Sequence, residues 1–114
     1  MTTNFNGFNE KVLTFECDTE ISAGTPVKIT ANGKVAACSA GDRFVGICVN
    51  TRGGYACVQV EGYVSSAYTG TAPTVNVTKL VADGNGGVKA DATNGGEVVA
   101  VCVDTTAKTI GFIM

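Results

Sequence analysis

The sequence predicts an all-β fold: a small barrel or sandwich built from two pseudo-repeated β units, with almost no helix. Three observations support this prediction. Short windows alternate apolar and polar residues, as half-buried strands do. Turn-forming residues separate these windows, since the chain has 15 glycines and Asn32-Gly33 is a strong two-residue hairpin signal. No window combines a sustained 3.6-residue apolar period with a capping residue, as a helix would.

Strands are expected in eight windows: Lys11–Cys17, Val27–Thr30, Arg43–Thr51, Tyr55–Glu61, Thr74–Val81, Gly87–Ala90, Glu97–Asp104 and Lys108–Ile113. Alternation places Leu13 and Ile29 on the inner faces of the first two. The third window has consecutive apolar residues at its centre, which predicts that both of its faces are covered. Residues 62–74 are small and aromatic and end near a proline, so we expect an irregular excursion there.

A repeat is the most informative internal feature. An ungapped shift of 54 positions superposes Cys48 on Cys102 and also matches Gly41/Gly95, Val45/Val99, Val49/Val103 and Thr51/Thr105. The pseudo-repeats cover about residues 27–60 and 79–114. One such unit is too short to enclose a core, so two units are expected to close one barrel or sandwich together. Residues 11–114 then form a single β domain, preceded by an N-terminal arm over residues 1–10.

Composition argues against several classes of function. The chain of 114 residues is 45% hydrophobic and 16% charged, which indicates one ordered domain. A net charge of −2 with scattered basic residues predicts no nucleic-acid partner, and no apolar stretch approaches the roughly 20 residues that span a bilayer. Without histidine there is no Ser-His or Cys-His pair and no histidine ligand for a metal. We therefore expect a non-catalytic protein without cofactor, metal or membrane partner.

The five cysteines are odd in number and lack CxxC spacing, and no signal-peptide pattern follows Met1. We expect reduced thiols, mostly packed as small hydrophobic residues in a protein made in a cytosol. A Cys48–Cys102 disulfide is an alternative, because the repeat relates these two positions. The glycine-rich segment Asp83–Gly87 is expected to be a hairpin turn with glycine at positive φ rather than a phosphate or calcium loop.

The N-terminal arm holds the first candidate binding residues. Phe5 and Phe8 are large apolar side chains on an otherwise polar segment, with Asn4 beside them. Such side chains have little reason to be there unless they dock on this domain, on a neighbouring subunit or on a larger partner. Asn4, Phe5 and Phe8 are therefore candidates for the attachment site.

A second set of candidates surrounds the expected hairpin at residues 50–54. Arg52 is one of two arginines and either anchors a partner or is an ordinary solvated side chain. Tyr55, Tyr63 and Tyr68 cluster around this hairpin and the excursion, and they either form an interface or are partly buried in the core.

The apolar rhythm resembles that of small capsid decoration, or head-stabilising, proteins from tailed-phage and prophage head gene clusters. The residues that carry the resemblance are Ile21–Val27, Phe44–Val49 and Val58–Val64, and the pattern recurs at Gly87-Val88 and Val98–Val103. It covers roughly residues 12–114 and consists of glycines and small apolar residues. Five cysteines and an arm with two phenylalanines depart from the family pattern.

The resemblance implies a compact β fold, a homotrimer and a seat on the outside of an assembled capsid, held partly through an N-terminal arm. The major capsid protein is then the partner and the virion the location. The alternative is a non-catalytic bacterial β module that binds a ligand or carbohydrate, although the chain has no tryptophan to serve as a sugar platform.

Overall fold

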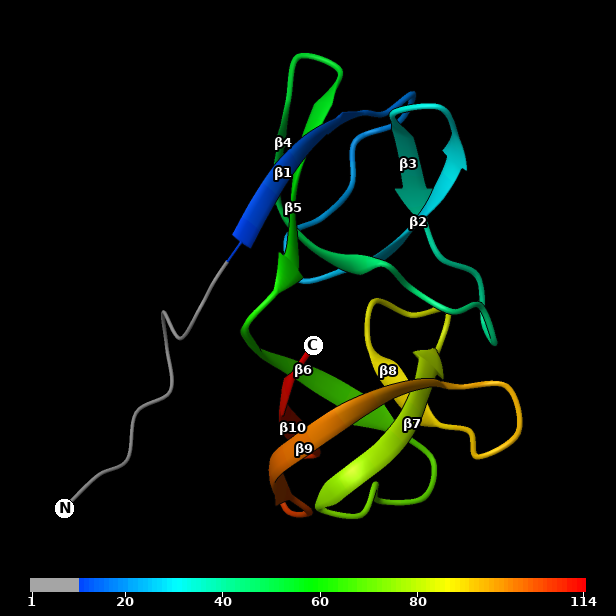
Figure 1. The fold of residues 1–114 in the computed structure, drawn as a ribbon, viewed down its shortest axis with the longest axis vertical. Helices are drawn as coiled ribbons and strands as arrows, with labels where there is room; N and C mark the ends of the chain where they lie inside the picture. Colours follow the sequence, from blue (N-terminus) through cyan, green and yellow to red (C-terminus); the bar gives the residue numbers. More distant parts are fainter. Residues whose placement is uncertain (1–10) are drawn as a thin grey trace, which may run out of the picture.

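The computed structural model describes residues 11–114, which contain ten strands and no helix (Figure 1). The strands are β1 (Lys11–Glu16), β2 (Pro26–Ala31), β3 (Lys34–Ala37), β4 (Gly46–Arg52), β5 (Tyr55–Glu61), β6 (Tyr63–Thr69), β7 (Asn76–Ala82), β8 (Val88–Ala90), β9 (Gly96–Asp104) and β10 (Thr109–Ile113). The prediction of an all-β fold with two similar units is confirmed.

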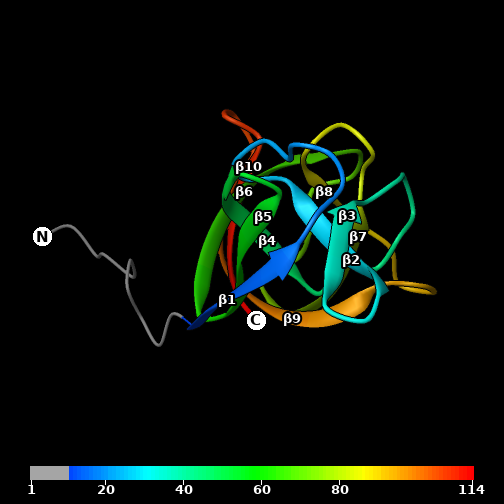
Figure 2. The same ribbon diagram turned by 90° about the horizontal axis from the view of Figure 1, so that it is seen from above.

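Each half of the chain closes into its own five-stranded barrel, and the two barrels share one topology. The strand orders are β1-β3-β2-β4-β5 and β6-β8-β7-β9-β10. In each barrel the first strand runs parallel to the third and antiparallel to the fifth. The barrels are stacked along the long axis of the molecule (Figure 1), and Figure 2 looks along this stack.

The expectation that one unit cannot enclose a core is therefore wrong. The predicted units, 27–60 and 79–114, each omitted a first strand, β1 or β6, which completes the barrel. The β6 strand lies where we expected an irregular excursion. Buried and exposed residues do alternate along β6, with Val64, Ser66 and Tyr68 buried. Because the strand is rich in small and polar residues, this alternation gives only a weak apolar signal in the sequence.

Strand register also corrects the repeat. Cys102 pairs with Gly111 as Asn50 pairs with Cys57, and each pair follows a β-bulge in its hairpin. Equivalent residues of β5 and β10 are thus 54 positions apart in the sequence, whereas equivalent residues of β4 and β9 are 52 positions apart. The second hairpin is two residues longer at its tip, so the superposition of Cys48 on Cys102 is displaced by two residues.

Each barrel encloses a hydrophobic cluster. The first consists of Cys17, Ile21, Val27, Val35, Cys48, Ala56 and Val58. The second consists of Ile47, Val64, Tyr68, Leu80, Val88, Val98, Ala100, Ile110 and Phe112. Ile47 lies on β4 of the first barrel but packs into the second core, with Phe44 beside it, so the two barrels share side chains where they meet.

The loop before β4 fastens the barrels through backbone hydrogen bonds as well. The Gly41 amide donates to the Ala82 carbonyl at 2.9 Å, and the Ala82 amide donates to the Asp42 carbonyl at 2.8 Å. Nε of Arg43 donates to the carbonyl of Asn94 at 2.6 Å. Residues 11–114 are consequently two small barrels held together at one waist.

Two burial predictions in the first barrel are wrong. Leu13 and Ile29 share the inner face with the buried Val58 and Val35, with which they pair, but both are exposed. Leu13 is left uncovered because β3 pairs with β1 only at Glu16 and Lys34. The window 43–51 is covered on both faces at its centre, where Ile47 packs into the second core and Cys48 into the first, whereas Val45 and Val49 are exposed.

Candidate functional site

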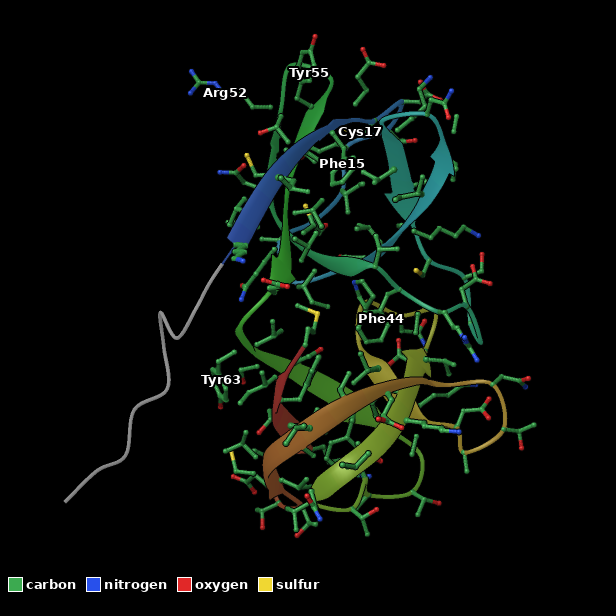
Figure 3. The ribbon with its side chains drawn as sticks, viewed as in Figure 1. Phe15, Cys17, Phe44, Arg52, Tyr55 and Tyr63 are labelled. Carbon is green, nitrogen blue, oxygen red and sulfur yellow. The ribbon has the colours of Figure 1, made fainter. Side chains whose placement is uncertain are left out.

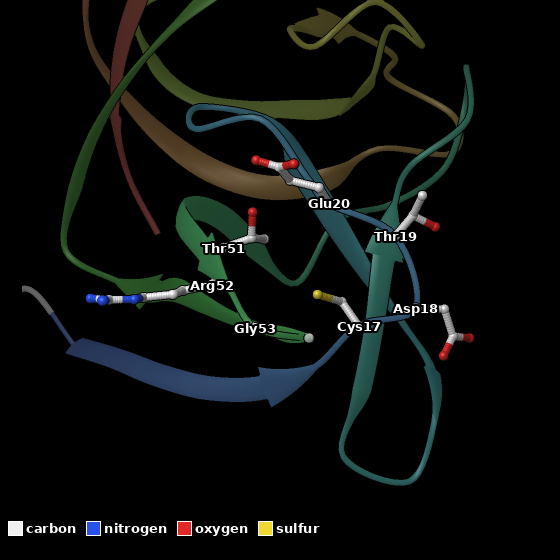
Figure 4. Close-up of a pocket in the computed structure, with 8 residues that line it drawn as sticks. Cys17, Asp18, Thr19, Glu20, Thr51, Arg52 and Gly53 are labelled. Atoms are coloured by element: carbon white, nitrogen blue, oxygen red, sulfur yellow. The ribbon is translucent and has the colours of Figure 1, made fainter.

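A polar cavity lies at the end of the first barrel that is far from the waist. It has a volume of about 350 Å³ and lies between the β1–β2 loop and the β4–β5 hairpin (Figure 4). The lining residues are Cys17, Asp18, Thr19, Glu20, Thr51, Arg52, Gly53 and Gly54. Two hydrogen bonds hold its walls: the Cys17 amide donates to the Gly54 carbonyl at 2.9 Å, and the Thr51 hydroxyl donates to the Ile21 carbonyl at 3.2 Å.

The charges of this cavity are partly satisfied within the barrel. Asp18 accepts a hydrogen bond from Lys34 at 3.1 Å, and this contact raises the pKa of Lys34. Arg52 forms no ion pair with another residue of the described 11–114 segment. Arg52 and Glu20 line the cavity from two different walls, the β4–β5 hairpin and the β1–β2 loop (Figure 4), with glycine backbone between them at the hairpin tip. This is a polar surface suited to a small hydrogen-bonding ligand.

The four candidate interface residues do not form one patch, and Figure 3 shows Arg52 and Tyr55 on the first barrel far from Tyr63 on the second. Arg52 and Tyr55 face each other across the β4–β5 hairpin, and both are exposed. Tyr68 is 3% exposed within the second core, so for this residue the interpretation as a core tyrosine is confirmed. Tyr63 is partly buried on the second barrel. The three arm candidates, Asn4, Phe5 and Phe8, lie outside the described residues.

Tyr63 packs against a glycine of the neighbouring strand. A Cβ at Gly111 would collide with the Tyr63 hydroxyl, so the ring needs the absence of a side chain there. The hydroxyl also lies 3.7 Å from Sγ of Cys102. Burial, together with the hydrogen bond to Cys102, raises the pKa of Tyr63. The side chain is thus held flat against the outside of the second barrel.

Sequence reasoning missed an apolar row to which Tyr63 belongs. Val77 pairs with Val99, Val99 pairs with Ile113, and Ile113 pairs with Tyr63, on four adjacent strands in the order β7, β9, β10 and β6. Paired residues share one face of a sheet, so the four side chains form a continuous outer row. Val77 and Val99 are 54% and 43% exposed. The signal in the sequence was the consecutive apolar run Val98–Val103, in which both faces of β9 are apolar.

All five cysteines are free thiols. Cys17 and Cys48 are buried, Cys38 and Cys57 are intermediate, and Cys102 is exposed. The alternative of a Cys48–Cys102 disulfide is wrong, because the first thiol lies in the core of one barrel and the second on the outside of the other. Burial raises the pKa of Cys38 to about 11 and also raises the pKa of Cys48.

The segment Asp83–Gly87 is the tight turn that its glycines predicted. Oδ1 of Asp83 accepts hydrogen bonds from the amides of Asn85 at 2.7 Å and Gly87 at 3.0 Å. Gly84 and Gly86 have φ values of 84° and 88°, which only glycine adopts without strain. The carboxylate is therefore committed to the turn itself.

No metal-binding group of three or more His, Cys, Asp or Glu side chains occurs within residues 11–114. The same residues contain no helix long and apolar enough to cross a membrane. Neither protein-family models nor curated proteins show a match to this sequence.

Proposed function

We propose that this protein decorates the capsid of a tailed phage, binding the outside of the assembled shell as a homotrimer. The outer row Val77–Val99–Ile113–Tyr63 is the observation that carries the proposal. Four apolar side chains in register across four strands form a contiguous surface, which is typical of an interaction site rather than of scattered exposed residues. The resemblance to decoration proteins supplies the class of partner.

The outer row serves as the contact between copies of the chain. Each apolar side chain that it buries contributes roughly 1.5–3 kcal/mol when fully covered. Lys79 and Glu97, which pair on β7 and β9 next to the row, give it a charged border. An apolar centre with a charged rim is the usual anatomy of a protein interface.

The shell contact is assigned to the major capsid protein, with the arm residues Asn4, Phe5 and Phe8 as the attachment site. The protein acts in the virion after synthesis in the host cytoplasm and needs no cofactor. Three linked copies raise the effective concentration of each further arm once one arm has bound. Individually weak contacts then suffice for stable decoration.

Light scattering tests the self-contact. Wild-type protein is expected at three times the 11.6 kDa chain mass, and Val99→Asp is expected as a monomer because assembly would bury its carboxylate in the interface. Val49→Asp is the matched control, since Val49 is equally exposed but lies on the first barrel. Wild-type monomers both in solution and on shells would contradict the trimer.

Cosedimentation with expanded empty shells of the same phage tests the decoration. Wild-type protein is expected to pellet with shells until the sites saturate, and failure to pellet at any concentration would overturn the proposal.

The polar cavity beside Arg52 favours a second candidate function, a module that binds a small ligand or carbohydrate. Chemical-shift titration with mono- and disaccharides tests it directly. Shifts confined to the cavity residues and lost in Arg52→Ala would favour this function over decoration.

A further inference from the structure

The first strand of the first barrel has an open edge. Along its length β1 pairs with β5, but it pairs with β3 only at Glu16 and Lys34. The Glu16 amide donates to the Gly33 carbonyl at 2.8 Å, which fixes the side of the strand that faces β3. Backbone groups alternate between the two sides of a strand, so those of Thr14 and Val12 point the same way. Within residues 11–114 no strand pairs with them there. We call Val12–Thr14 the open edge.

The inward-facing residue at this edge lacks the core cover that its counterpart in the second barrel has. Leu13 pairs with Val58 as Val64 pairs with Phe112, so Leu13 and Val64 hold equivalent positions in the two barrels. Val64 is 5% exposed, whereas Leu13 is 53% exposed. Val12 is also 48% exposed. Apolar side chains thus lie on both faces of a strand whose backbone donors and acceptors are available, which is the arrangement that accepts an added strand.

The charge at the open edge indicates the chemistry of what binds there. Natural sheet edges are commonly protected by lysine. Here Lys11 is bound to Glu61 at 3.1 Å, and Lys34 to Asp18 at 3.1 Å. Val12, Leu13 and Thr14 carry no charge. The matching strand is therefore uncharged along its paired length, with an apolar side chain directed at Leu13.

The chain's own N-terminal residues are a poor match for this edge. Their strongest turn signal is Asn6-Gly7. A two-residue turn there would set Phe5 opposite Phe8 and Thr2 opposite Lys11, so neither phenylalanine would reach Leu13.

A second copy is also a poor match. Two β1 edges that pair antiparallel are related by a twofold axis, and such an isologous contact closes as a dimer, not as the proposed trimer.

We infer that the open edge of β1 receives an extended, uncharged segment of the shell protein, which adds to the first barrel as a further strand. This inference rests on the proposed function and names the surface through which the β domain itself contacts the shell. The added strand pairs with the backbone of Val12 and Thr14 and covers Leu13. The arm and this edge then contact the shell together, since the arm leads directly into β1.

Thr14→Pro tests the inference, because it removes an amide that faces the open side and carries no hydrogen bond within the barrel. Ser65→Pro is the matched control. Ser65 pairs with Gly111 as Thr14 pairs with Cys57, and its amide also faces away from the last strand of its barrel. In cosedimentation with empty shells, Thr14→Pro is expected to bind at least about tenfold more weakly than wild type, and Ser65→Pro to bind like wild type.

Hydrogen exchange gives a second measurement that needs no variant. The amides of Val12 and Thr14 are expected to exchange rapidly in the free full-length protein and at least about tenfold more slowly on shells. Protection already present in the free protein, lost on removal of residues 1–10, would assign the edge to the chain's own arm. Loss of the trimer in Thr14→Pro would assign it to a second copy. Either result overturns the inference.

The two proposals fail in different ways. Wild-type protein that does not pellet with shells contradicts the decoration function. Wild-type binding that Thr14→Pro retains at the level of Ser65→Pro contradicts only the strand addition.

Discussion

The ring of Phe44 packs against the ring of Phe112 with their centroids 6.1 Å apart and their planes tilted by 59°. Phe44 belongs to the loop before β4 of the first barrel, whereas Phe112 is fully buried in the core of the second. Ile47 enters the same core three residues later. The end of the second barrel is thus closed by side chains of the first, and the two barrels depend on one another for burial.

Phe44→Ala is expected to lower the free energy of unfolding by about 2 kcal/mol. A fully buried phenylalanine loses about 3–5 kcal/mol on truncation, and Phe44 is only partly buried. Urea unfolding followed by far-ultraviolet circular dichroism measures the change. Val45→Ala is the control, because the neighbouring Val45 is exposed. Equal destabilisation by the two variants would show that the ring contact does not couple the barrels.

Gly46→Ala and Gly96→Ala form a second matched pair. A Cβ at Gly46 would lie 2.6 Å from Cγ1 of Val58 and would collide with the Gln59 carbonyl. At Gly96 the nearest atom is 4.0 Å away. We expect Gly46→Ala to destabilise the fold by about 1–3 kcal/mol through strain. Gly96→Ala should be neutral or stabilising by up to about 1 kcal/mol, since it restricts the unfolded chain. Thermal unfolding that ranks them the other way would contradict the packing at β4.

Local pattern was enough to predict most strands and turns. The windows at Tyr55–Glu61 and Glu97–Asp104 match β5 and β9 to within one residue, because β-branched residues and bounding glycines give a clear signal there. The predictions that failed depended on contacts between strands that are far apart in the sequence. Leu13 alternates like a core residue, but β3 pairs with β1 at a single position and leaves Leu13 exposed. No window of the sequence contains that information.

For the candidate surfaces too, the sequence pattern identified single residues but not how strand order brings them together. Tyr68 was recognised as a residue of either core or interface, and only the register of β6 places it in the second core. The outer row joins residues as far apart in sequence as Tyr63 and Ile113. Such a surface is a property of strand order, which a single sequence with weak β6 alternation does not reveal.

Thiol labelling is expected to follow burial. Unfolded protein should expose five reactive thiols, whereas in the folded chain Cys102 should react first and Cys17 and Cys48 last. Because burial raises the pKa of Cys38 to about 11, its thiol is largely protonated at pH 8 and should react slowly. Peptide mapping after brief alkylation measures the order in which the thiols react. The Val99→Asp variant is used so that the proposed contact between copies does not shield any cysteine. Labelling of Cys48 ahead of Cys102 would contradict the placement of these thiols.

Asp42 should make the waist sensitive to acid. The hydrogen bond from Lys28 at 2.6 Å, helped by the Ser39 amide, lowers the pKa of Asp42 below its usual 3.8. A lowered pKa in the folded state means that the stabilisation is present above the usual value and is lost as the pH falls through the lowered one. Wild type should therefore melt above Asp42→Asn at pH 7, and the difference should shrink towards pH 2. A constant difference in Tm would show that the carboxylate charge does not stabilise the loop.

The arm carries the sharpest prediction for the proposed function. The hydrogen-bonded strands of the first barrel begin at Lys11, and both cores consist of residues from Cys17 onwards. Deleting residues 1–10 should consequently leave the Tm nearly unchanged. It should strongly weaken attachment to shells, because Phe5 and Phe8 each contribute roughly 1.5–3 kcal/mol if the partner buries them fully.

Phe5→Ala combined with Phe8→Ala should reproduce most of that loss in cosedimentation, with Asn4→Ala and Asn9→Ala together as the control for changes in the same segment. The double change is needed because neither phenylalanine is expected to account for the whole loss alone. The proposed backbone pairing at the open edge of β1 would add to the contact of the arm, so the deletion and Thr14→Pro should weaken binding further when combined. If the truncated protein binds shells as tightly as wild type, the arm is not an attachment site and the contact belongs to the barrels alone.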